Sequence, residues 1–220
     1  MMNPTIPYRI AGAILAGGKA RRMGGIAKGM LPANGHLSLI ERLVVHMMRS
    51  GVDEIIIAAN DERPYTRIGC AVVPDQRTDA GPLAGIEAAL GYFAGRYDAV
   101  LCLPCDLPSV SWKEMSALIA TFARTGDPVV FAQTEGSDSH PLCAVVHTNL
   151  LDRVSAALDA GQSAVHDLWL QVEGTAVQFD NANAFANLNS PEDVEAWLGV
   201  PNAKFGVGGP LAGRPNGRRR

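Results

Sequence analysis

The sequence predicts an α/β fold of three layers, in which a mostly parallel sheet carries helices on both faces. Strand and helix signals alternate along the first half of the 220-residue chain, as they do in sheets built from strand–helix–strand units. The strand candidates include apolar runs, which indicates that both of their faces are covered. Right-handed crossovers between parallel strands follow from this arrangement.

The first half is expected to hold four strands and three helices. Residues 10–16 form an apolar run that ends in glycines, which is typical of a buried strand. Residues 37–50 repeat apolar side chains at helical spacing, and Gly51 ends that helix. The following elements are a strand at 55–59, a short strand at 71–73, a helix at 82–94, a buried strand at 99–103 and a helix at 111–125, where Ser111 and Glu114 form a capping box.

The second half is expected to be less regular. Residues 129–133 and 142–146 are predicted as strands that are antiparallel neighbours at the edge of the sheet. The remaining elements are a helix at 148–160, a helix at 164–170, a short strand at 177–179 and a last helix that opens at Ser190 with a proline and an acidic first turn. We expect one domain over residues 1–199. Residues 200–220 are predicted to be a disordered tail, with a basic nucleic-acid-binding arm as the alternative.

Composition and charge exclude several classes of protein. The hydrophobic share of 47% and charged share of 19% are those of an ordinary globular protein. A net charge of −3 argues against a dedicated nucleic-acid-binding protein. No run approaches the roughly 18 apolar residues of a membrane span, and residues 1–9 lack the pattern of a secretion signal. We therefore expect a cytoplasmic protein without a nucleic-acid or membrane partner.

Cys102 and Cys105 form a C-x-x-C pair, which is one half of many metal or redox sites. They stand at the end of a predicted buried strand, and no second pair of cysteines or histidines completes a zinc set. The pattern favours small core side chains, and a metal or redox pair is the alternative.

A glycine-rich, basic stretch follows the first strand. It reads AILAGGKARRMGG over residues 13–25, and Lys28 comes shortly after it. It matches neither G-x-G-x-x-G nor the Walker A loop, because Lys28 is followed by Gly29. Free backbone N–H groups and several cations suit the phosphates of a nucleotide. The alternative is a flexible surface loop with solvated charges.

Asp106 directly follows another predicted strand. Ligands of parallel sheets gather outside the carboxyl ends of the strands, so Asp106 and the glycine-rich stretch should meet at one edge. A carboxylate there can hold Mg²⁺. The alternative is a turn or helix-capping aspartate, although Ser111 already caps the next helix.

Six stretches carry a resemblance to a known family, and they occur in the family's order. The sequence resembles the molybdenum cofactor guanylyltransferases, within the nucleotidyltransferase superfamily. The first stretch is shared with many nucleotidyltransferases, whereas GPLAG, PCD-x-P and N-x-N-x-P-E are specific to the molybdopterin branch. The stretches are LAGGKARRMGGIAKG (15–29), AAN (58–60), DQRTDAGPLAG (75–85), CLPCDLP (102–108), HP (140–141) and FANLNSPEDV (185–194).

The resemblance implies a Rossmann-like nucleotidyltransferase fold and a reaction. It implies transfer of GMP from GTP to the molybdenum-bound molybdopterin cofactor with release of pyrophosphate, and Mg²⁺ as the cofactor. Molybdoenzymes or their chaperones are further candidate partners. The alternatives are a molybdopterin cytidylyltransferase, a sugar-phosphate nucleotidyltransferase and a non-catalytic nucleotide-binding protein.

The resemblance also assigns roles to residues. The catalytic candidates are Asp106, Lys28 and Arg22, and Asp106 is also the metal ligand. Asn187 and Asn189 are assigned to the pterin. The nucleotide-binding candidates are Leu15, Ala16, Gly17, Gly18, Lys28, Asn60, Asp75 and Asp106.

Some of these positions have a structural alternative, and three stretches depart from the family, one of them His36-Leu37 in place of a usual Lys-Pro. Asp75 can be a turn residue, and the two asparagines can belong to a loop before a helix. His140 is a candidate base or a structural residue. Ala58 stands where the family often has asparagine, and residues 162–164 replace a common basic residue.

Overall fold

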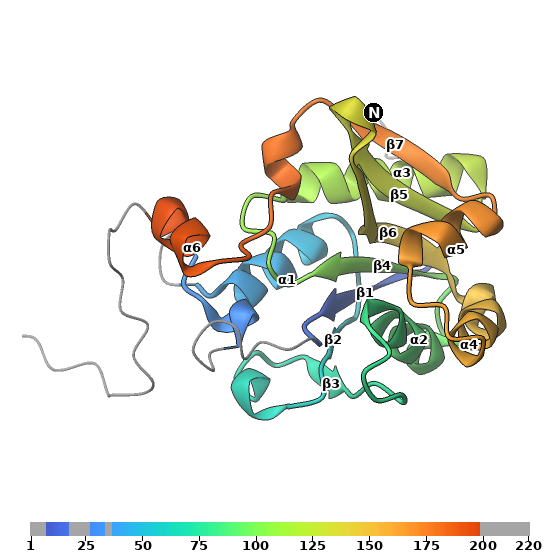
Figure 1. The fold of residues 1–220 in the computed structure, drawn as a ribbon, viewed down its shortest axis with the longest axis horizontal. Helices are drawn as coiled ribbons and strands as arrows, with labels where there is room; N and C mark the ends of the chain where they lie inside the picture. Colours follow the sequence, from blue (N-terminus) through green and yellow to red (C-terminus); the bar gives the residue numbers. More distant parts are fainter. Residues whose placement is uncertain (1–7, 18–26, 34–36, 199–220) are drawn as a thin grey trace, which may run out of the picture.

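The computed structural model describes residues 8–17, 27–33 and 37–198. Within these residues, seven strands form one sheet in the order β3-β2-β1-β4-β6-β5-β7, and β6 is antiparallel to both of its neighbours (Figure 1). The mostly parallel sheet is therefore confirmed. The strands are β1 Ile10–Leu15, β2 Ile55–Ala58, β3 Ala71–Val73, β4 Ala99–Pro104, β5 Val129–Thr134, β6 Ser139–His147 and β7 Thr175–Phe179.

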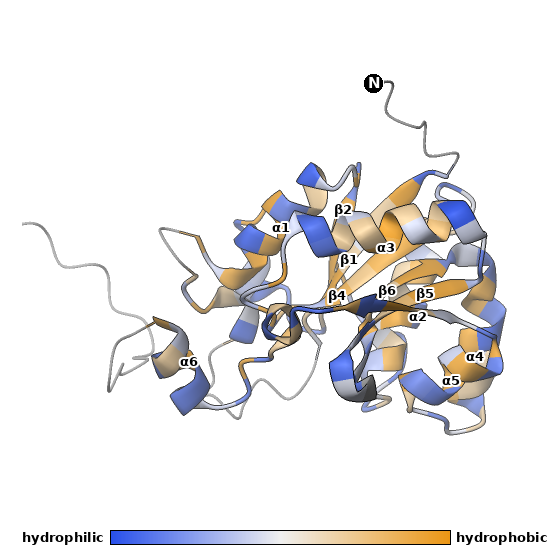
Figure 2. Ribbon diagram, turned by 90° about the horizontal axis from the view of Figure 1, so that it is seen from above, coloured by the Kyte–Doolittle hydropathy of each residue, from blue (hydrophilic) through white to orange (hydrophobic). Residues whose placement is uncertain are grey.

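Helices cover both faces of the sheet. Figure 2 shows α1 and α3 on one side, and α2, α4 and α5 on the other. The last helix, α6, lies outside these layers, on the side to which the arrowheads of β1 and β4 point (Figure 1). None of the helices in the described ranges is long and apolar enough to cross a membrane. The helices are α1 Leu39–Arg49, α2 Pro82–Phe93, α3 Trp112–Thr125, α4 Leu151–Asp159, α5 Val165–Gln171 and α6 Pro191–Leu198.

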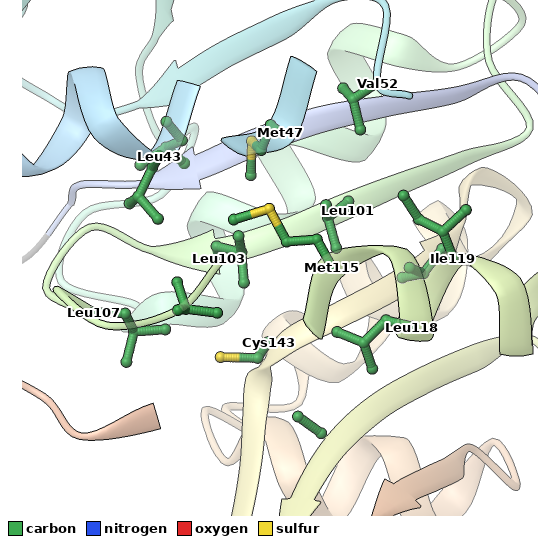
Figure 3. Close-up of a cluster of buried hydrophobic side chains, with 14 of the residues drawn as sticks. Leu43, Met47, Val52, Leu101, Leu103, Leu107, Met115, Leu118, Ile119 and Cys143 are labelled. Atoms are coloured by element: carbon green, nitrogen blue, oxygen red, sulfur yellow. The ribbon is translucent and has the colours of Figure 1, made fainter. Parts of the chain in front are cut away.

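Two apolar layers hold the helices on the sheet. Met47 of α1 and Met115 of α3 are fully buried against β1 and β4, as Figure 3 shows for the first layer. The second layer contains Phe93 of α2 and Trp169 of α5. The indole N–H of Trp169 donates a hydrogen bond of 2.8 Å to the Pro141 carbonyl, so this polar group is satisfied inside the core.

The cysteines of the C-x-x-C pair belong to these layers. Cys102 is fully buried and Cys105 nearly so, and burial raises the pKa of each thiol to about 12. A thiol with such a pKa stays protonated at neutral pH, which makes it a poor nucleophile. Their prediction as core residues is confirmed.

Helix starts follow the capping signals of the sequence. The expected capping box at Ser111 and Glu114 opens α3. An equivalent box opens α1, where the Ser38 N–H donates to a Glu41 carboxylate oxygen at 2.7 Å. Such caps satisfy backbone donors that a helix leaves without an intrahelical partner.

One expectation about the sheet is partly wrong. Strands β5 and β6 pair antiparallel as predicted, but they do not form the edge. Strand β6 lies between β4 and β5, and the parallel strand β7 covers the outer side of β5. Residues 143–146 are accordingly buried, because both faces and both sides of this strand are occupied.

Gly12 allows α1 to lie close to β1, and its replacement should be costly. A Cβ at this position would lie 2.9 Å from Met47 Sδ and 3.0 Å from Val52 Cγ1. We expect Gly12→Val to lower the free energy of unfolding by about 1–3 kcal/mol, since the core must shift to admit the side chain. Urea denaturation measures this, with Gly91→Ala in α2 as the control. Gly91 has space for a methyl group and should gain about 0.5–1 kcal/mol; an unchanged Gly12→Val variant would contradict the close packing.

Candidate active site

The carboxyl ends of four parallel strands meet at one edge of the sheet. The Ala16 N–H donates to the Ala58 carbonyl at 2.9 Å, which joins the ends of β1 and β2. The Cys105 N–H donates to the Leu15 carbonyl at 3.1 Å, which joins β4 to β1. The segments that follow these strands therefore begin side by side, as the sequence predicted.

Three distant segments bring Lys28, Asp106 and Asn189 together at this edge. Lys28 Nζ lies 3.2 Å from Asp106 Oδ2 and 3.3 Å from Asn189 Oδ1. The side chains of Lys28 and Asp106 are 19% and 17% exposed, so the ion pair is partly shielded and still reachable by a ligand. The arrangement offers one cation, one carboxylate and one amide within a few ångströms.

Local packing explains why Lys28 reaches this position. It begins the 3-10 turn Lys28–Met30, and a Cβ on the next residue, Gly29, would lie 3.1 Å from Ile40 Cδ1. A glycine therefore lets the turn lie against α1. Leu31, directly after the turn, packs with Leu188 of the segment before α6. These contacts hold the lysine turn and the asparagine segment against each other.

Asn189 is fixed by the cap of α6. The Asp193 carboxylate accepts hydrogen bonds of 2.8 Å from the N–H groups of Asn189 and Ser190, and these bonds lower the pKa of Asp193. The Leu188 N–H donates to the Asp106 carbonyl at 3.0 Å. The segment is thus tied to α6 and to the end of β4 at the same time.

Asp75 and Asn60 form a second polar group at the same edge. Asn60 Nδ2 donates to Asp75 Oδ2, and the Asp75 N–H donates to Asn60 Oδ1, both at 2.9 Å. Asp75 Oδ1 is buried and has no hydrogen-bond partner among the described residues. Burial raises the pKa of Asp75, and the Asn60 hydrogen bond opposes that shift. A buried carboxylate oxygen without a donor is costly, which favours a donor from a bound molecule.

Glycine backbone lies close to the Asp75 carboxylate. A Cβ on Gly17 would lie 3.4 Å from Asp75 Oδ2, and a Cβ on Gly85 would lie 3.6 Å from Oδ1. Gly81, the residue before α2, has a φ of 75°, which favours glycine. The GPLAG stretch thus brings bare backbone close to the carboxylate.

The other sequence candidates fall into three groups. Leu15 points its side chain into the core, and Ala16 is half-buried at the end of β1, so both offer backbone at the edge. Asn187 is exposed, two residues before Asn189. Gly18 and Arg22 lie outside the described residues.

His140 has a structural position. Its ring stacks on Phe185 at 4.8 Å between centroids, and its Nε2 lies 3.2 Å from Thr134 Oγ1. Burial lowers the pKa of His140, which favours the neutral ring. Phe185 precedes the Asn187–Asn189 segment, so the histidine ring packs against the start of that segment.

The sequence reasoning missed the role of Asp193. Ser190 and Asp193 have the spacing of a capping pair, and Ser190 Oγ accepts a hydrogen bond of 3.1 Å from the Asp193 N–H. That spacing was visible in the sequence, but its consequence for Asn189 depends on the bound backbone N–H groups and could not be inferred.

Comparisons with known proteins place the chain in a family. Residues 12–173 match the model of the MobA-like NTP transferase domain. The chain is 33% identical to a molybdenum cofactor guanylyltransferase of Polynucleobacter asymbioticus, covering 86% of this chain and 96% of the relative. It is 34% identical to the protein of that name from Burkholderia vietnamiensis, covering 89% and 98%.

A solved structure also shares the fold. The molybdopterin-guanine dinucleotide biosynthesis protein A of Archaeoglobus fulgidus superimposes with a TM-score of 0.68 at 21% identity, covering 85% of this chain and 96% of that one. The family match covers most of the chain, and the relatives match nearly their whole length. The chain therefore belongs to the molybdenum cofactor guanylyltransferase family and carries its MobA-like NTP transferase domain.

Proposed function

We propose that the protein transfers GMP from GTP to the phosphate of the molybdenum-bound molybdopterin cofactor and releases pyrophosphate. The observation that carries the proposal is the meeting of Lys28, Asp106 and Asn189 at the sheet edge that also holds Asp75, whose buried Oδ1 has no partner among the described residues. The names of the relatives at 33–34% identity support the choice of guanine and molybdopterin. The domain over residues 1–199 would hold both substrates, and molybdoenzymes or their chaperones would receive the product.

The chemical step joins two anions. A phosphate oxygen of the acceptor attacks the α-phosphorus of GTP, a new P–O bond forms, and the bond to the β-phosphate oxygen breaks. The acceptor phosphate is already ionised near pH 7, because its second pKa is about 6. The reaction therefore needs little general-base catalysis. Positioning and charge neutralisation then supply most of the catalysis.

Lys28 is the described cation best placed for this task. Its ammonium group is already oriented by Asp106 and Asn189 and is partly exposed, so it can turn toward a triphosphate oxygen. Arg22 would act with it as a phosphate clamp, and Gly17 and Gly18 would present backbone N–H groups. Asn187 and Asn189 would contact the pterin.

The donor set at Asp106 fits Mg²⁺. Among the described residues, no cluster of three or more histidine, cysteine, aspartate or glutamate side chains could hold a metal alone. Mg²⁺ is commonly bound by one or two carboxylates together with substrate phosphates and water, and Asp106 supplies one such carboxylate. When bound, the ion would neutralise charge on the triphosphate and on the leaving pyrophosphate. Asp106 is the residue that would hold it.

Asp75 is proposed to accept a hydrogen bond from the nucleotide through Oδ1. We expect Asp75→Asn to raise KM for GTP about tenfold with a smaller change in kcat, because the contact exists before and during the chemical step. Steady-state kinetics measures this, and Asp61→Asn is the matched control. Asp61 forms an exposed ion pair with Arg63 one residue beyond Asn60 and should change KM less than twofold. Equal KM values for Asp75→Asn and the parent would remove Asp75 from the nucleotide site.

Pyrophosphate release from different substrate pairs tests the proposed reaction. We expect release from GTP in the presence of molybdenum cofactor and Mg²⁺, and little release from CTP. Faster turnover with CTP would indicate a cytidylyltransferase, and turnover with a sugar 1-phosphate would indicate a sugar-nucleotide synthase. Tight GTP binding without any release would indicate a nucleotide-binding protein without catalysis.

A further inference from the structure

A salt bridge between a partly exposed arginine and a buried glutamate stands next to the proposed nucleotide site and has no part in the proposed reaction. Glu87 of α2 is 4% exposed, and the guanidinium group of Arg77 binds both of its carboxylate oxygens. Arg77 Nε lies 3.1 Å from Oε1 and 2.9 Å from Oε2, and Nη2 lies 3.0 Å from Oε1. This forked contact fixes the orientation of the arginine more strictly than a single point contact would.

The same arginine also reaches α4. Its Nη1 pairs with the Asp159 carboxylate, and Nη2 donates to the Ser155 carbonyl at 3.4 Å. Helices α2 and α4 lie side by side on this face of the sheet (Figure 1). Arg77 thus joins three segments: the connection between β3 and α2, the body of α2, and the end of α4.

The contacts of Arg77 lie close to Asp75 in the sequence and to the start of α2. Arg77 follows Asp75 by two residues, and its partner Glu87 follows Gly85 by two residues on α2. Asp75 Oδ1 would lie 3.6 Å from a Cβ on Gly85, so the carboxylate and the start of α2 are close neighbours. The Arg77–Glu87 pair bridges the two chain segments on which this neighbourhood depends.

The network extends to the segment that follows α4. Asp159 ends α4, and Ser163 lies four residues later. The Cβ of Ser163 lies 3.7 Å from where a Cβ on Gly81 would be. Arg77 therefore binds the end of α4, and the turn that follows α4 lies against Gly81, the residue before α2.

We propose that Arg77 is a positioning residue of the nucleotide site: through Glu87 and Asp159 it sets the distance between the Asp75 carboxylate and the start of α2. The inference rests on the proposed function, since it takes Asp75 as a nucleotide contact. Arg77 itself does not touch the substrate. Its loss leaves the chemistry intact and loosens the site, which weakens GTP binding.

The test replaces the whole pair, because removing one partner alone would leave a buried charge. The Arg77→Met, Glu87→Leu double variant puts apolar side chains of similar size in its place, which commonly preserves stability. We expect its KM for GTP to rise about tenfold, with kcat and KM for the molybdenum cofactor changed less than about threefold. The matched control is the Arg96→Met, Glu54→Leu variant, which removes an ion pair near the other end of α2. It should leave KM for GTP within about twofold of the parent.

A double-mutant cycle with Asp75→Asn separates positioning from a purely structural role. If Arg77 acts through Asp75, removing the pair in the Asp75→Asn background adds less than about twofold to KM for GTP. Full additivity, or an unchanged KM in the pair variant, would overturn the inference. Should the pair variant fail to fold, Arg77→Lys serves instead. Lysine retains the charge opposite Glu87 but not the fork, so we expect about a threefold rise in KM that is again absent in the Asp75→Asn background.

Direct binding of GTP, measured by calorimetry on the same proteins, keeps the two proposals apart. A parent protein that binds GTP without turnover would contradict the proposed function. The positioning role would then be judged on the dissociation constants, which should follow the pattern expected for KM. A protein that turns over GTP and whose pair variant binds GTP as tightly as the parent would contradict the positioning role alone.

Discussion

Lys28→Met is expected to lower kcat/KM for GTP by about 10³-fold while the protein stays folded. The ammonium group of Lys28 is held 3.2 Å from Asp106 Oδ2 and 3.3 Å from Asn189 Oδ1, at the edge where the triphosphate is proposed to bind. Methionine keeps much of the length of the side chain and removes its charge. The loss of activity should therefore come from the missing positive charge, which neutralises the phosphates. Steady-state kinetics with GTP and molybdenum cofactor measures this loss.

The control for this variant is Lys113→Met, near the start of α3. Lys113 is exposed on the surface of α3, so its removal should change kcat/KM less than twofold. Lys28→Arg should retain part of the activity, because it restores the charge with a different geometry. Activity of Lys28→Met within tenfold of the parent would contradict the assignment of the phosphates to this edge.

Asp106→Asn should be at least as damaging, with a loss of about 10³-fold or more in kcat and a weaker response to Mg²⁺. Asparagine preserves the size of the side chain and a carbonyl oxygen for Lys28, so the local structure should survive. What is lost is the negative charge proposed to hold the ion. Activity measured across a Mg²⁺ titration shows the effect as a midpoint displaced to higher concentration.

An exposed aspartate provides the matched control for that titration. Asp167 of α5 has a side chain that is 65% exposed, and Asp167→Asn should leave both the rate and the Mg²⁺ midpoint unchanged. An Asp106→Asn variant with the parent's midpoint would show that Asp106 is not a metal ligand.

Much of the fold could be predicted because local signals and global topology agree. The short apolar runs of β1 and β4, each followed by residues typical of turns, indicate buried strands, and the parallel-sheet rule then places Asp106 beside the segment after β1. The position of β6 could not be predicted in the same way. An apolar run such as residues 142–146 indicates a buried strand. Which strands lie next to it depends on the path of the chain through the later helices, and the run itself carries no information about that path.

Part of the candidate site could also be predicted from the sequence, and part could not. The glycine-rich stretch and Asp106 directly follow strands, so the sequence predicts that they are close, and Lys28 comes shortly after that stretch. The approach of Asn189, 161 residues after Lys28, was implied by the resemblance alone. The pairing of Asn60 with Asp75 and of Arg77 with Glu87 depends on side-chain contacts between elements, and neither periodicity nor spacing carries that information.

The central claim is that these segments surround one nucleoside triphosphate whose α-phosphate is transferred. The most direct measurement incubates the protein with molybdenum cofactor, Mg²⁺ and GTP labelled at either the α- or the γ-phosphate. The account predicts that the α-label appears on the cofactor and the γ-label in pyrophosphate, and that Lys28→Met slows both by about 10³-fold. Transfer of the γ-label to the cofactor, or no transfer of the α-label by the parent protein, would contradict it.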